Sequence, residues 1–141
     1  MTLRIADRLL QQVRRAGEAA YPAECCGAIV GQADGAKRAG NLVPLANRRT
    51  DDPHRYLIDA EQMRKVERDA KAAGWEVLGF YHSHPDHPAV PSEFDTVHAW
   101  PWYSYVIVQV TQGQALLVAS WVLHPEDPRM EPEPLEVESE A

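Results

Sequence analysis

Residues 75–85 read WEVLGFYHSHP, and this stretch determines the expected fold. The run from 77 to 81 is almost entirely apolar, which is typical of a central strand covered on both faces of a sheet. The strand ends in a His-x-His pair, His82 and His84, whose side chains point to the same face, roughly 6–7 Å apart at their Cα atoms. We therefore expect a buried strand that presents two imidazoles side by side at its end.

A helix is predicted immediately before this strand. Asp59 can cap it, Gln62 follows three residues later as in a capping box, and Gly74 suits its end. Further upstream, apolar residues spaced by three and four indicate a helix over residues 5–20. Between the two helices we expect strands over residues 24–31, 42–45 and 55–58, with a polar turn over residues 32–40.

After the central strand, three prolines between residues 85 and 91 indicate a loop. Ser92 can then cap a short helix that runs to about Ala99. Two β-prone runs follow, at residues 103–110 and 115–123, and a turn joins them. Helices and strands therefore mix within one unit, which predicts a mixed β-sheet flanked by helices, an α/β (α+β) fold, in a single domain over residues 1–124.

Residues 125–141 differ in composition from the rest of the chain. They contain four prolines, seven acidic residues and one basic residue, whereas the whole chain of 141 residues has a net charge of −7. Such a segment buries too little apolar surface to offset its ordering entropy, so we expect an acidic, proline-rich and flexible tail. A solubilising role explains it more simply than a docking role.

Charge and hydropathy exclude several functions. Without the tail the chain is nearly neutral, so it lacks the basic surface of a nucleic-acid-binding protein. No apolar run reaches the ~20 residues that span a bilayer, and we see no secretory signal near the N-terminus. We therefore expect a cytoplasmic protein without a membrane partner. The adjacent Cys25 and Cys26 are expected to be small core residues, because a disulfide between neighbours is strained.

The candidate chemistry lies at His82, His84 and Asp95, the last in the first turn of the third predicted helix. Two imidazoles and one carboxylate leave a fourth tetrahedral position open for water, which is the pattern of a catalytic zinc site. Glu24 opens an apolar strand and can serve as general base toward a zinc-activated water. Ser92 can donate a hydrogen bond to the developing oxyanion.

Each of these residues also has a simpler explanation. A His-x-His pair is a weak signal by itself, and Asp95 suits the N-terminus of any helix. Glu24 can be an exposed residue at a strand entry, and Ser92 can act only as a helix cap. Cys26 as a further metal ligand is a less favoured alternative. The remaining histidines are expected at the surface or in packing: His54, His87, His98 and His124.

Together these residues resemble the motif of the JAMM (MPN+, Mov34-type) zinc metalloprotease family. The motif is His82-x-His84-Pro85-x5-Pro91-Ser92-x-x-Asp95 with Glu24 upstream, and every position is filled. The resemblance extends to about residue 123 and implies a compact, cytidine-deaminase-like MPN domain. It also implies that the two histidines and the aspartate bind one Zn²⁺ per chain, with Glu24 as the acid/base and Ser92 as the oxyanion stabiliser.

The resemblance further implies a substrate class. Only eight residues separate Asp95 from Ser104, which leaves little room for the ubiquitin-gripping insertions of eukaryotic deubiquitinases. The chain is thus similar to minimal prokaryotic members, which process ubiquitin-like sulfur carrier proteins. We expect a zinc-dependent peptidase or isopeptidase that hydrolyses the bond after the carrier's C-terminal Gly-Gly, with the carrier's tail along an exposed strand edge.

Other interpretations stay open. A peptidase of a phage-tail or conjugation/defence system would use the same motif, although phage-tail versions usually carry a second hydrolase domain. A non-catalytic MPN scaffold is disfavoured by the complete motif, and a DNA-repair relative by the lack of basic charge. Exposed edges and three tryptophans can support a homodimer, although burial would explain the aromatic rings equally well: Trp100, Trp102 and Trp121.

Overall fold

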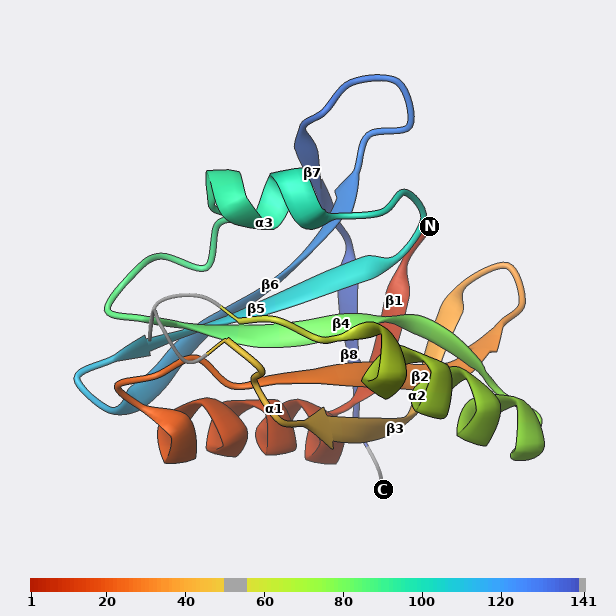
Figure 1. Cartoon of the computed structure of the whole chain (residues 1–141), viewed down its shortest axis with the longest axis horizontal. Coiled ribbons are helices and arrows are strands. Elements are labelled where there is room, and N and C mark those ends of the chain that lie inside the picture. Colours follow the sequence, from red (N-terminus) through yellow and green to blue (C-terminus); the bar gives the residue numbers. More distant parts are fainter. Residues whose placement is uncertain (50–55, 140–141) are drawn as a thin grey trace.

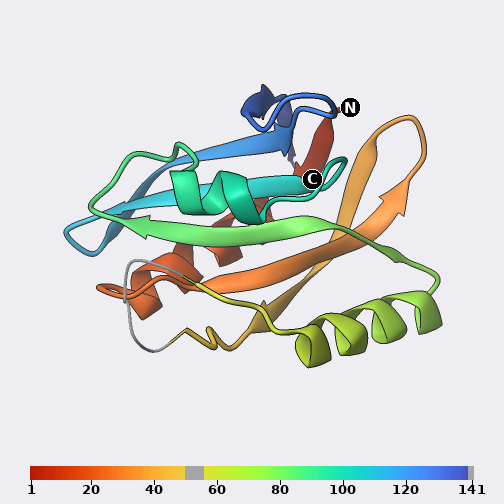
Figure 2. The same ribbon diagram turned by 45° about the horizontal axis from the view of Figure 1, so that its top comes forward.

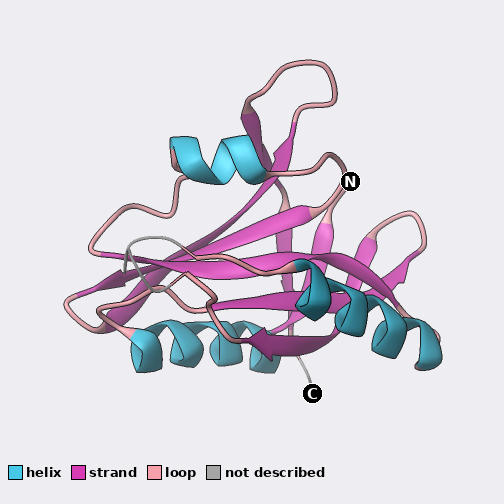
Figure 3. Ribbon diagram, viewed as in Figure 1, coloured by secondary structure: helices cyan, strands magenta, loops and turns pink. Residues whose placement is uncertain are grey.

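The computed structural model describes residues 1–49 and 56–139, and their strands form one sheet flanked by helices (Figures 1 and 3). The helices are α1 (Asp7–Ala20), α2 (Ala60–Ala72) and α3 (Glu93–His98). The strands are β1 (Leu3–Ala6), β2 (Cys26–Ala33), β3 (Lys37–Leu45), β4 (Glu76–Pro85), β5 (Ser104–Thr111), β6 (Gln114–Leu123), β7 (Met130–Glu133) and β8 (Leu135–Glu138). Their order across the sheet is β7-β6-β5-β4-β2-β3-β1-β8.

Strand β4 is central, as the apolar run predicts. It pairs antiparallel with β2 and parallel with β5, and its residues from 77 to 85 are all buried. Tyr81 packs in the core that includes α1, and Phe80 packs in the core that includes α2. Because side chains alternate between the faces of a strand, His82 and His84 lie on the face of Phe80.

Helices α1 and α2 cover different faces of the sheet (Figure 2). Val13 of α1 packs in one core with Ile29, whereas Val66 of α2 packs in the other core with Ala28, the neighbour of Ile29 on β2. Helix α2 begins with the predicted capping box, in which the side chain of Asp59 accepts from the N–H of Gln62. Among the described residues, no helix is long and apolar enough to cross a membrane.

The first predicted helix begins two residues late in the structure. Residues 3–6 form strand β1, which pairs in parallel with β3 and β8, and helix α1 starts at Asp7. Leu3 and Ile5 are 0% and 1% exposed, so they alternate toward the core as strand residues do. The spacing from Ile5 to Leu9 fits a helix equally well, and only the neighbouring strands favour the extended form.

Two further sequence predictions differ from the structure. The predicted turn over residues 32–40 is shorter, because β3 already begins at Lys37 and the turn is centred on Gly35, whose φ is +72°. The predicted strand over residues 55–58 is wrong for its described part: residues 56–58 have irregular backbone, and Arg55 lies outside the described residues.

The acidic tail is also part of the sheet, although we expected it to be flexible. Strand β7 pairs with β6, and β8 pairs with β1 at the opposite edge, so the C-terminal segment joins both ends of the sheet. The carboxylate of Glu133 lies 3.1 Å from the Nζ of buried Lys37 and accepts a 2.8 Å hydrogen bond from Ser120. Strand pairing offsets the ordering entropy of the segment, and the contacts of Glu133 with Lys37 and Ser120 leave its buried carboxylate with polar partners.

Candidate metal centre

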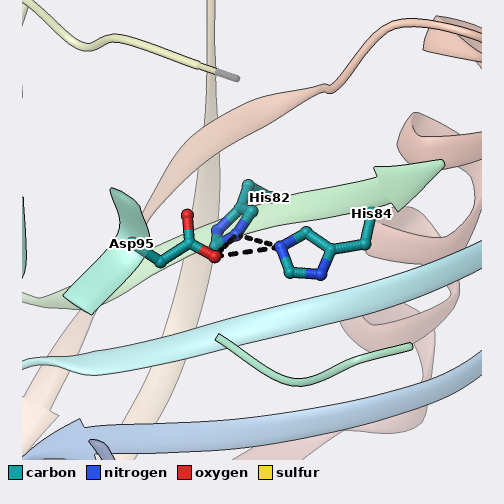
Figure 4. Close-up of side chains that lie close together, drawn as sticks. All are labelled: His82, His84 and Asp95. Carbon is teal, nitrogen blue, oxygen red and sulfur yellow. Dashed lines mark hydrogen bonds and ion pairs between the residues drawn. The ribbon is translucent and has the colours of Figure 1, made fainter. Parts of the chain in front are cut away.

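The two histidines of β4 meet Asp95 from the first turn of α3 (Figure 4). The Nε2 atoms of His82 and His84 are 3.1 Å apart, and the Oδ2 of Asp95 lies 3.2 Å from the first and 2.9 Å from the second. Three potential ligand atoms therefore converge on one point, with all of them within 4.8 Å of one another. The side chains of His82 and His84 are almost completely buried.

A capping box at the start of α3 holds Asp95 in this position. The side chain of Ser92 accepts a 3.0 Å hydrogen bond from the N–H of Asp95, and the N–H of Ser92 donates to Asp95 Oδ2 at 2.9 Å. The predicted cap role of Ser92 is therefore confirmed. The same hydrogen bonds that begin the helix orient the carboxylate toward the histidines.

The loop after β4 orients the ring of His84. Its Nδ1 lies 2.8 Å from the carbonyl oxygen of Pro88, which can only accept a hydrogen bond, so Nδ1 carries the proton. In the neutral ring, Nε2 then presents a lone pair toward Asp95 and His82. A metal-binding histidine is commonly oriented by a hydrogen bond of this kind from its other nitrogen.

The protonation states suit a cation. Burial lowers the pKa of His82, which favours its neutral form. Burial acts to raise the pKa of Asp95, but the two imidazoles beside its carboxylate outweigh this effect and hold that pKa well below its usual range. Two imidazoles and a carboxylate facing one point form a donor set that fits Zn²⁺, with a fourth position left for water.

Glu24 lies beside this centre, on the short segment before β2. Cys26 on β2 pairs with His82 on β4, which brings the start of β2 next to the histidines. The side chains of Glu24, His84 and Ser92 line one cavity of about 590 Å³. Glu24 is only 6% exposed, so the simpler expectation of an exposed strand-entry residue does not describe it.

Neither cysteine belongs to the three converging ligand residues. Cys26 is buried, and its thiol contacts the carbonyl oxygen of Leu45, which agrees with a core role. Burial raises the pKa of Cys26 to about 12, so the thiol is protonated at neutral pH. Cys25 is half-buried and packs against the core.

The other histidines have varied surroundings. His87 is exposed but lines the cavity that contains Glu24, a location that its loop position did not reveal. The ring of His98 lies tilted against that of Phe94, with centroids 4.1 Å apart, and the Nδ1 of His124 accepts from two backbone N–H groups. His54 lies outside the described residues.

An aromatic residue that no sequence motif points to, Tyr56, also lies at the centre. The ring of Tyr56 stacks on His82, with centroids 4.5 Å apart and planes inclined by 27°. The sequence predicts only a strand over residues 55–58 and gives Tyr56 no role in the site. No local pattern signals this contact, because it joins segments that are distant in the sequence.

Comparisons with known proteins agree with this geometry. A family model described as prokaryotic homologs of the JAB domain matches residues 6–124. The chain is 34% identical over 102 residues to a desampylase from Haloferax volcanii, covering 72% of this chain and 73% of that protein. It is 32% identical over 89 residues to a probable TtuB-protein conjugate cleaving protease from Thermus thermophilus, covering 63% of this chain and 60% of that protein.

The fold also agrees with a solved structure. A JAB1/MPN domain protein from Archaeoglobus fulgidus matches with a TM-score of 0.60 and 20% identity, over 97% of this chain and 98% of that one. The expected MPN-type fold, a mixed sheet with flanking helices, is therefore confirmed. The chain belongs to the prokaryotic JAB-domain family and is a JAMM-type hydrolase.

Proposed function

We propose that this chain is a zinc-dependent isopeptidase or peptidase that cuts after the C-terminal Gly-Gly of a ubiquitin-like sulfur carrier protein. The observation that carries the proposal is the convergence of His82, His84 and Asp95 beside a cavity that also contains Glu24. Three protein ligands with one position free are typical of a catalytic zinc site rather than a structural one.

Glu24 is the proposed proton carrier. When bound, zinc supplies a nucleophilic water at neutral pH and polarises the carbonyl of the bond to be cut. The carboxylate of Glu24 faces the same cavity as His84, so it can take a proton from the attacking water and return it to the leaving nitrogen. Glu24 is only 6% exposed, so its carboxylate lies largely out of contact with bulk solvent.

Ser92 is the proposed oxyanion stabiliser. Its oxygen accepts the capping hydrogen bond from Asp95, but a hydroxyl also has one hydrogen to donate. Ser92 is exposed and lines the cavity, so this hydrogen can reach the carbonyl oxygen of a bound substrate. Donors of this kind act where negative charge develops in the transition state.

The relatives support the proposed substrate class. One is named a desampylase and another a probable TtuB-protein conjugate cleaving protease, which supports a conjugate of a ubiquitin-like protein as the substrate here. We expected the substrate's tail along a strand edge, but β4 is paired on both sides by β2 and β5. We therefore expect the tail to enter through the cavity instead.

Intact mass spectrometry would test this function. Ubiquitin-like proteins of the same genome would be offered with a C-terminal extension beyond Gly-Gly or as a lysine conjugate. We expect loss of the extension or of the conjugated lysine, and inhibition by a zinc chelator. E24Q should retain zinc but lose at least about 100-fold in rate, whereas E76Q, at the far end of β4 and exposed, should match the wild type.

Two results would contradict the proposal. Cleavage by E24Q at the wild-type rate would remove Glu24 from the reaction. No cleavage of any carrier by the zinc-loaded protein would exclude this substrate class and favour substrates of a conjugation/defence or phage-tail system.

Homodimerisation also stays a prediction, supported by the exposure of Trp100 and Trp102 at 68% and 40%, and analytical ultracentrifugation would test it.

A further inference from the structure

The two candidate histidine ligands are held in different ways. The ring of His84 is fixed by the hydrogen bond between its Nδ1 and the carbonyl oxygen of Pro88. The Nδ1 of His82 is buried and has no hydrogen-bond partner within residues 1–49 and 56–139. Because a hydrogen bond from the second nitrogen normally sets the plane of a ligand histidine, something else must set the plane of His82.

The ring of Tyr56 is in the right place to do so. It stacks on His82 with centroids 4.5 Å apart and an interplanar angle of 27°. A nearly parallel ring at this distance resists rotation of the imidazole, because turning either ring would bring its edge into the face of the other. Neither ring needs a polar atom for this contact, so the stabilisation comes from the aromatic face of Tyr56.

Asn47 in turn fixes the backbone beside Tyr56. Its Oδ1 accepts a 3.0 Å hydrogen bond from the N–H of Leu57, and the N–H of Arg48 donates to the carbonyl oxygen of Leu57 at 2.9 Å. The Nδ2 of Asn47 also donates to the carbonyl oxygen of Glu24 at 3.4 Å. One amide side chain therefore connects the segment that bears Tyr56 to the segment that bears Glu24.

We propose that Tyr56 is a positioning residue that holds the imidazole of His82 in the plane needed for metal binding, and that Asn47 seats Tyr56. This inference rests on the proposed zinc site but not on the identity of the substrate. The alternative is that Tyr56 is only an aromatic residue of the core. The two differ in what they predict for metal affinity when the ring is changed.

Three substitutions distinguish a positioning role of Tyr56 from a role as a core residue only. Y56F keeps the aromatic face and removes the hydroxyl, whereas Y56L removes the face. Y103L is the matched control, since Tyr103 contacts the ring of Phe80 edge-on. Zinc affinity would be measured by competition with a chelator. We expect Y56L to bind zinc about 10-fold more weakly or worse, and Y56F and Y103L to stay within about twofold of the wild type.

The metal-free protein gives an independent readout. Stacking on Tyr56 should shift the ring-proton NMR signals of His82 upfield by ring current. We expect this shift to persist in Y56F and to be lost in Y56L. The absorption spectrum of the cobalt-substituted protein should likewise change in Y56L alone, because it reports the ligand geometry.

The outcomes are distinct. Wild-type zinc affinity and an unchanged His82 signal in Y56L would overturn the positioning role. If Y56L does not fold, N47A replaces it: weaker zinc binding would support the proposal, and wild-type zinc binding would overturn it. A wild-type protein that binds no zinc would instead remove the zinc site itself, and this result is visible before any variant is compared.

Discussion

The N–H of Ser92 donates to Oδ2 of Asp95, the same oxygen that lies within 3.2 Å of the Nε2 atoms of both candidate histidine ligands. The hydrogen bond that starts helix α3 therefore also fixes the third ligand. Ser92 therefore caps the helix through its side chain and orients Asp95 through its backbone N–H. The effects of a substitution on stability and on activity can be measured separately.

S92A should lower the free energy of unfolding by about 1 kcal/mol, because the cap acceptor for the N–H of Asp95 is lost. The backbone N–H remains, so zinc affinity should change little. If the hydroxyl also stabilises the oxyanion, kcat should fall by about 100-fold. Urea unfolding and steady-state kinetics would check this. S92T retains the hydroxyl and should recover most of both properties; an S92A enzyme with unaltered kcat would limit Ser92 to capping.

Zinc should stabilise the folded chain, because the three ligands converge only in the native structure. At a free zinc concentration 100 times the dissociation constant, the gain in the free energy of unfolding should be about 2.7 kcal/mol. Thermal unfolding with zinc and with a chelator would measure it. D95N keeps the size of the side chain but removes its charge, so it should lose most of the gain. An equal gain in D95N would place the metal elsewhere.

Removing the cation of the buried Lys37–Glu133 ion pair should lower the free energy of unfolding far more than removing the cation of an exposed pair. Both side chains are 1% exposed, so K37M leaves the carboxylate of Glu133 buried without its cation. We expect a loss of about 3–5 kcal/mol in the free energy of unfolding. K65M is the control, because the Lys65–Asp69 pair is exposed and should contribute less than about 1 kcal/mol. Equal losses in urea unfolding would contradict this prediction.

Stability should decrease at alkaline pH. Burial raises the pKa of Cys26 from 9.0 and of Tyr105 from 10.0, each to about 12. A group with a raised pKa in the folded state stabilises it below the unfolded pKa and loses that contribution as the pH passes the folded pKa. The free energy of unfolding should therefore fall between about pH 9 and pH 12. Urea titrations across this range should show a shallower fall in C26A; an identical slope would argue against the role of Cys26.

Local sequence patterns were sufficient for several elements. The apolar run of β4 predicted a central strand, and the capping residues Asp59 and Ser92 predicted the starts of α2 and α3. These signals are local, because alternation in a strand and hydrogen bonding at a helix start involve residues within four positions of each other. The same signals placed the two histidines on one face.

Non-local contacts decided the structure of the N-terminal strand β1 and of the C-terminal segment. Ile5 fits a helix or a strand by its spacing, and it belongs to β1 because β3 and β8 flank that segment. Residues 130–138 look too polar to fold by themselves, and they join the sheet because β6 and β1 offer unpaired edges and Lys37 offers a buried cation. None of these three partners can be recognised from the sequence of residues 130–138 alone.

The sequence by itself therefore determined the central strand and the helix caps, and it singled out the five candidate site residues, because each of these inferences depends on short-range spacing or on a motif. Only the tertiary structure decided that Glu24 shares a cavity with His84, that Tyr56 stacks on His82 and that the C-terminal segment closes the sheet. The physical reason is that these contacts join distant segments, and their free energy depends on which surfaces the folded chain brings together.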